Sequence, residues 1–148
     1  MLNGVIKMNY VRNNDNIFVS LQKGDEIFES LYRVIELEKI QSGWINGIGA
    51  CEKVEIACYN SEIKDYNKKY FDQHFEIINL IGNITKSEGD SFLHLHITLS
   101  DCEYNAIGGH LFRAIITATC EIMIILNSKS INRSYNPDVG LCLWNLDN

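Results

Sequence analysis

The chain has 148 residues, of which 46% are hydrophobic and 22% are charged, and this balance predicts one folded domain spanning residues 1–148 and excludes a disordered chain. Its net charge of −6 argues against direct DNA binding, because nucleic-acid affinity comes largely from lysines and arginines that neutralise phosphates. Five cysteines without a C-x-x-C pair predict buried, reduced thiols. Because no apolar run reaches the length of a signal peptide or a membrane span, we expect a cytoplasmic protein with no membrane contact.

The first half of the chain predicts one strand and one helix. Residues 16–21 mix apolar and β-branched side chains and precede a turn at residues 22–24, as a strand does. A helix is predicted over residues 25–41, where apolar residues recur at helical spacing. Asp25 can cap its first turn, and Gly43 stands where a left-handed residue would end it.

Beyond the helix the chain changes to short runs rich in β-branched and aromatic residues, which predict five or more strands. These runs are WINGIGAC, KVEIACYN, HFEIINLIGNIT, SFLHLHITLS and IITATCEIMIIL. Glycines in or beside them predict bends, bulges or turns at Gly47, Gly49, Gly82 and Gly89. Residues 61–73 are polar and predict a surface excursion, whereas LCLWNL in the tail from 127 to 148 predicts a final short strand.

Two histidines share one face of the strand in SFLHLHITLS. The two-residue period of a strand places the leucines on one face, which we expect in the core, and His94 and His96 on the other. Imidazoles at this spacing can reach one cation, with Zn–N bonds of about 2.0–2.1 Å. The alternative is a pair of half-exposed or hydrogen-bonded histidines without a metal.

A third ligand candidate is His110 in AIGGHLF, because open zinc sites usually have three protein ligands. Gly108 and Gly109 precede it and would support it, since glycine permits close backbone approach or a positive φ. We expect a loop here that returns the imidazole to the strand face.

Glu76 and Glu121 each interrupt an apolar strand run. A carboxylate in such a run needs a partner, so each is predicted either to pair with an arginine or to orient a ligating imidazole. The alternative is a solvent-facing position on a strand. His74, the remaining histidine, is predicted to be a strand-edge residue.

The segments HFEIINLIGNIT, LHLHITLSD, GGHL and TCEIMII, in this order, together with the upstream WINGIGACEKVEIACY, resemble the PPC domain (plants and prokaryotes conserved). The resemblance implies an α+β fold with a mostly antiparallel sheet, assembled as a homotrimer. Plant relatives pair this domain with an AT-hook, an Arg-Gly-Arg-Pro element that enters the DNA minor groove, and prokaryotic members are often labelled predicted DNA-binding proteins. This sequence contains no such element, so the implied contribution is oligomerisation or binding of partner proteins.

The H-x-H pattern with a downstream histidine is similar to that of acetolactate decarboxylases, whose zinc is held by three histidines on a related fold. The resemblance implies that His94, His96 and His110 bind zinc or another divalent transition metal. Three interpretations remain open. The chain is a non-enzymatic PPC-type module linked to DNA or transcription, a zinc-dependent enzyme acting on a small oxo or hydroxy acid by Lewis-acid chemistry, or a structural oligomerisation domain without chemistry.

Overall fold

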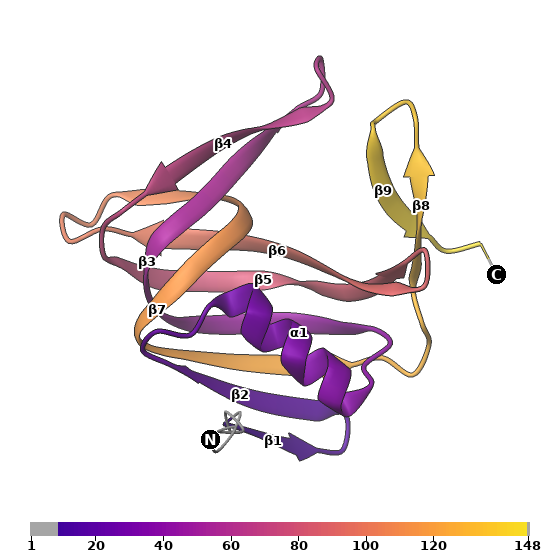
Figure 1. Cartoon of the computed structure of the whole chain (residues 1–148), viewed down its shortest axis with the longest axis horizontal. Coiled ribbons are helices and arrows are strands. Elements are labelled where there is room, and N and C mark those ends of the chain that lie inside the picture. Colours follow the sequence, from indigo (N-terminus) through magenta and orange to yellow (C-terminus); the bar gives the residue numbers. More distant parts are fainter. Residues whose placement is uncertain (1–8, 148) are drawn as a thin grey trace, which may run out of the picture.

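The computed structural model describes residues 9–147, which form a sheet-dominated domain with one helix (Figure 1). The expected absence of a signal peptide concerns mainly residues 1–8, which lie outside the described residues. In chain order the elements are β1 (Tyr10–Asn13), β2 (Asn16–Gln22), α1 (Ile27–Glu38), β3 (Gly43–Asn60), β4 (Asp65–Phe71), β5 (Phe75–Ser87), β6 (Asp90–Ser100), β7 (Ala106–Leu126), β8 (Asn132–Asn136) and β9 (Leu141–Asn145).

Two long strands, β3 and β7, organise the sheet because each pairs with different neighbours along its length. The main order is β1-β2-β7-β3-β5, and β6 pairs with both β5 and the first part of β7. Strands β3, β5, β6 and β7 therefore form a closed ring of pairings. All pairs are antiparallel except the two-residue contact between β5 and β8, which confirms the α+β fold with a mostly antiparallel sheet and one main helix.

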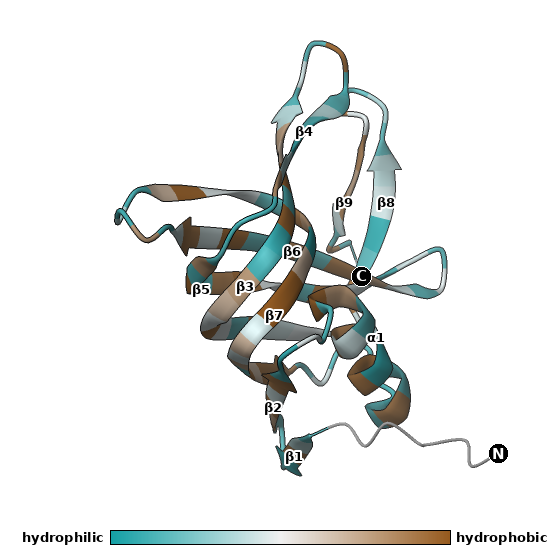
Figure 2. Cartoon of the chain, turned by 60° about the vertical axis from the view of Figure 1, so that its left-hand side comes forward, coloured by the Kyte–Doolittle hydropathy of each residue, from teal (hydrophilic) through white to brown (hydrophobic). Residues whose placement is uncertain are grey.

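Helix α1 covers one face of the sheet and buries Ile27, Leu31, Val34 and Ile35 against it (Figures 1 and 2). Because these side chains recur at intervals of three and four residues, they lie on one side of the helix. Strands β2, β3, β5, β6 and β7 supply most of the remaining core residues. Among the described residues, no helix has the length and apolar character that crossing a bilayer would require.

The predicted helix was too long at both ends. Its N-cap is Glu26, whose carboxylate accepts a hydrogen bond from a first-turn amide, whereas Asp25 accepts one from the amide of Gln22 and closes the preceding turn. The helix ends at Lys39, which adopts a left-handed φ of 52°. Gly43 already begins strand β3, so glycine was not needed for the cap.

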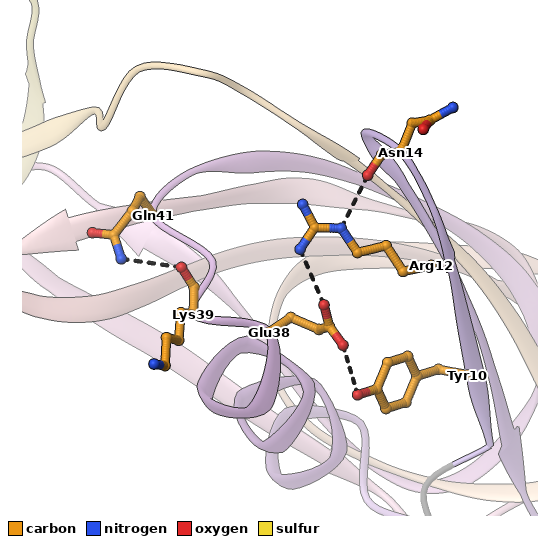
Figure 3. Close-up of polar contacts among 6 residues, drawn as sticks. All are labelled: Tyr10, Arg12, Asn14, Glu38, Lys39 and Gln41. Carbon is orange, nitrogen blue, oxygen red and sulfur yellow. Dashed lines mark hydrogen bonds and ion pairs between the residues drawn. The ribbon is translucent and has the colours of Figure 1, made fainter.

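Strand β1, which the sequence did not predict, is tied to the end of the helix by side chains (Figure 3). The hydroxyl of Tyr10 donates to the Glu38 carboxylate at 2.8 Å, and the guanidinium of Arg12 donates to the same group at 3.1 Å. These two hydrogen bonds lower the pKa of Glu38. The apolar content of β1 is low, and its order comes from pairing with β2 and from these contacts.

Residues 61–73 lie at the surface, as predicted, but most of them form strand β4, which pairs with the second part of β3 along seven positions. The tail likewise forms a hairpin of β8 and β9, so the predicted final strand is accompanied by one that was missed. The tips of these two hairpins meet, where the Tyr59 hydroxyl donates to the carbonyl of Val139 and the Lys64 ammonium donates to that of Pro137 at 2.6 Å. Both hairpins rise on the same side of the domain (Figures 1 and 2).

The cysteines are only partly buried. Cys51 and Cys120 lie in the core, as predicted, but Cys58 and Cys102 are exposed and Cys142 is half-buried. All five thiols are free. The prediction failed for Cys58 because it lies in the part of β3 that extends away from the core with β4.

Candidate metal centre

Strand β6 shows the predicted alternation of core-facing and outward-facing side chains. Leu93, Leu95, Ile97 and Leu99 are almost completely buried on the side that faces the core. His94 and His96 therefore project from the opposite face of the strand. Their Nε2 atoms lie 3.2 Å apart.

Strand β7 places the third imidazole beside this pair, because His110 is the direct register partner of His96. The ring centroid of His110 lies 5.1 Å from that of His94 and 5.3 Å from that of His96. One ligand nitrogen from each ring can be chosen such that all three lie within 4.8 Å of one another. The structure thus brings together the three histidines that the sequence singled out.

Gly108 and Gly109 belong to strand β7 and not to a loop. A Cβ atom would lie 2.6 Å from the carbonyl oxygen of Ile97 at Gly108, and 2.7 Å from that of Ala57 at Gly109. Neither glycine has a positive φ. Of the two roles expected for them, close backbone approach is the one observed: these glycines let β7 pass between β6 and β3 with His110 on the same face as His96.

The environment of the three rings favours neutral imidazole. Burial, with the neighbouring His96 and Arg133, lowers the pKa of His94 to about 4. Burial, with the other two histidines and Lys68, lowers the pKa of His110 to about 4. The pKa of His96 is also lowered by burial. At neutral pH all three rings are therefore unprotonated, which is the form that binds metals.

An aromatic wall, which sequence reasoning missed, covers His110. The ring centroids of Tyr66 from β4 and Phe112 from β7 lie 4.7 Å and 4.9 Å from that of His110. The ammonium of Lys68 lies 3.8 Å from the centroid of Phe112 and forms an ion pair with Glu55 at 2.9 Å. The local sequence around Tyr66 does not predict its contact with His110, because the pairing of β4 with β3 is what brings Tyr66 to the histidines.

The two glutamates lie elsewhere on the sheet. Glu76 is exposed, and its carboxylate lies 3.5 Å from Nε2 of His74. Glu121 lies in the second part of β7, opposite Ser20 of β2, whereas His110 lies in the first part. The supporting role of Glu76 and Glu121 stays a prediction.

The sequence profile of the Plants and Prokaryotes Conserved (PCC) domain matches residues 8–127. The chain belongs to this family. The match includes all three histidines and ends before the β8–β9 hairpin. No curated protein sequence matches the chain.

Solved structures with the same PCC fold include a proposed DNA-binding protein of Bacteroides thetaiotaomicron, with 36% identity, a TM-score of 0.90, and coverage of 93% of this chain and 96% of that one. A metal-containing protein of Archaeoglobus fulgidus shares 27% identity with a TM-score of 0.80, covering 93% of this chain and 96% of the other. The acetolactate decarboxylase of Bacillus subtilis shares 21% identity with a TM-score of 0.57, covering 88% of this chain and 60% of the enzyme. The similarity to this decarboxylase shows a related fold and nothing more.

Proposed function

We propose that this PCC domain binds a divalent transition metal, zinc or a cation of similar preference, through His94, His96 and His110. The observation that carries the proposal is the convergence of the three imidazoles, whose ligand nitrogens lie within 4.8 Å of one another. Three protein ligands leave a fourth position open in tetrahedral coordination. The metal-containing relative from Archaeoglobus fulgidus supports the assignment.

The donor set fits such a cation chemically. Imidazole nitrogens bind zinc, copper, iron and nickel, and rings with lowered pKa values release no proton when a metal binds. Nδ1 of His110 is also buried without a hydrogen-bond partner among the described residues. Because an unpaired buried polar atom is costly, a cation bound at this nitrogen would offset that cost.

Metal analysis of purified protein tests the proposal. We expect about one zinc per chain in the wild type and loss of that zinc in His96→Ala. His74→Ala is the matched control, because His74 contacts Glu76 and not the other histidines. Equal metal content in the wild type and His96→Ala would contradict the metal centre.

We further propose that the domain works as a homotrimer that binds partners. Support comes from apolar side chains that remain exposed on the strands of the main sheet: Val11, Phe18, Trp44, Ile48 and Ile125. Exposed apolar groups of this kind mark interaction surfaces. Light scattering should therefore give a mass three times that of the 16.9 kDa chain, and a monomer at micromolar concentration would contradict the trimer.

DNA is a possible partner because the Bacteroides thetaiotaomicron relative is a proposed DNA-binding protein. The net charge of −6 opposes direct contact, so we propose that any link to DNA or transcription runs through partner proteins. Titration of duplex DNA at several salt concentrations tests this. Tight binding that weakens steeply with salt would mean that the protein neutralises phosphates itself.

The second candidate is a metal-dependent enzyme that acts on a small oxo or hydroxy acid. The three-histidine donor set favours it, because a cation held there would keep a position for a substrate oxygen and would supply Lewis-acid chemistry. The expected signature is turnover that disappears in His96→Ala and persists in His74→Ala. If the protein binds metal but converts no such acid, the enzyme proposal is wrong and the non-enzymatic binding module remains.

A further inference from the structure

A guanidinium lies beside the three histidines, on a hairpin that follows the matched family segment. Arg133 stands at the start of β8, and its Cζ atom lies 4.7 Å from the ring centroid of Phe92 on β6. Its Nη2 atom donates to the side-chain oxygen of Asn83 at 2.9 Å. Phe92 precedes His94 by two residues on the same strand face, and Asn83 is the register partner of His94. The guanidinium therefore lies over the face of β5 and β6 from which the His94 imidazole projects.

The charge of Arg133 is not matched by an anion. Its hydrogen-bond acceptors are the Asn83 amide, the hydroxyl of Thr85 and the carbonyl of Cys142, all of which are neutral. Across residues 9–147, no carboxylate oxygen lies within 4 Å of it. The cation Lys68 differs, because it is paired with Glu55 at 2.9 Å.

This arrangement is costly unless a ligand completes it. The guanidinium is half-buried, and a charge withdrawn from water without a counter-charge lowers stability. A guanidinium has five N–H donors, and the three hydrogen bonds to protein leave one N–H on each of Nη1 and Nη2. A guanidinium can donate from two of its nitrogens to the two oxygens of one carboxylate.

The N–H donors of Arg133 are held in place by contacts with strands β5, β6 and β9. The stack on Phe92 and the hydrogen bonds to Asn83 and Thr85 fix the guanidinium against β5 and β6. Its bond to the Cys142 carbonyl joins it to β9. A donor fixed before binding loses little rotamer entropy when the ligand arrives.

We propose that Arg133 forms an anion subsite next to the three-histidine centre, and that the combined site takes a small dicarboxylate. One carboxylate pairs with the free N–H groups of Arg133, and the other occupies the open position of the cation. Two separated positive centres select a ligand with two negative groups over one with a single charge. The inference rests on the proposed metal centre and adds a ligand class to it.

The experiment compares succinate with its monoamide, succinamate, by calorimetric titration into zinc-loaded protein. Both keep one carboxylate for the cation, but only succinate offers a second to Arg133. We expect the wild type to bind succinate about ten- to a hundredfold more tightly than succinamate, as for a hydrogen-bonded charge pair. In Arg133→Gln this ratio should fall to about one, and Arg133→Lys should retain part of it. Arg12→Gln removes the same charge at the distant contact with Glu38 (Figure 3) and should keep the full ratio.

The readouts separate the two proposals. Zinc content reports the metal centre, and Arg133→Gln should still bind one zinc, which also shows that the variant is folded around the histidines. If the wild type holds zinc but binds succinate and succinamate equally, the anion subsite is wrong and the metal centre stands. If Arg133→Gln weakens both ligands by the same factor, Arg133 acts only by holding the hairpin and the subsite is again wrong. Failure of the wild type to hold zinc would remove the metal centre and the subsite with it.

Discussion

Replacing Gly82 with alanine should displace the strand that carries His94 and His96. Gly82 lies on β5 opposite Leu95, the residue between His94 and His96 on β6. A Cβ atom there would meet the carbonyl oxygen of His94 at 1.9 Å, whereas such atoms are essentially never closer than 3.0 Å. Strands β5 and β6 must therefore shift apart here by about 1.1 Å, which displaces the His94 backbone relative to β5, because a carbonyl in the middle of a paired strand cannot rotate away alone.

This displacement predicts two losses. Overpacking of a well-packed interior costs typically 1–3 kcal/mol, and we expect the unfolding free energy of Gly82→Ala to fall by about 3 kcal/mol. Metal sites require ligand distances within about 0.2 Å of ideal values, so zinc affinity should fall at least about tenfold, the lower end of the range for lost supporting contacts. Urea denaturation of the metal-free protein and competitive zinc titration measure the two quantities separately.

Gly89→Ala is the control from the same hairpin. Gly89 lies in the turn between β5 and β6, where a Cβ atom would meet nothing within 4 Å, but its φ of +91° strains an alanine. This variant should lose about 1–2 kcal/mol of stability and keep its zinc affinity. If Gly82→Ala is no less stable than Gly89→Ala and binds zinc as tightly as the wild type, then the close approach of Gly82 to the His94 carbonyl does not constrain the site.

Three further predictions concern protonation and surface contacts. The metal-free protein should lose stability as the pH falls from 6.5 to 4, because the imidazoles of His94 and His110 take up protons near pH 6.5 when unfolded but only near pH 4 when folded; denaturation at several pH values checks this, and a flat profile would contradict it. Glu38→Gln should cost less than about 1 kcal/mol, because the Arg12 side chain of the ion pair is exposed and the glutamine oxygen can still accept from the Tyr10 hydroxyl; thermal unfolding measures this. Tyr59→Phe removes one of the two hydrogen bonds between the hairpin tips and should speed amide exchange in β8 and β9 while leaving the exchange of β6 unchanged.

The local pattern of apolar residues was sufficient to predict features that depend only on which face of a helix or strand is buried. The apolar spacing that predicted α1 reflects its contact with the sheet, and the alternation in SFLHLHITLS placed His94 and His96 opposite the core residues of β6. It was insufficient for helix ends, because Asp25 and Glu26 can both cap and only the geometry of the turn selects Glu26. Polar strands such as β4 were missed because backbone pairing with β3, and not an apolar face, holds them.

The amino-acid sequence alone is enough to assign the family and to name the candidate ligands: two imidazoles on one strand face and a third behind two glycines. The position of the third imidazole beside the other two depends on tertiary structure, because the register of β7 against β6 places His110 opposite His96. The same holds for Tyr66 and Arg133, which reach the site from two hairpins whose local sequences carry no sign of it. Contacts between strands depend on pairings made across the whole sheet, and a local pattern of side chains does not encode which strands will meet.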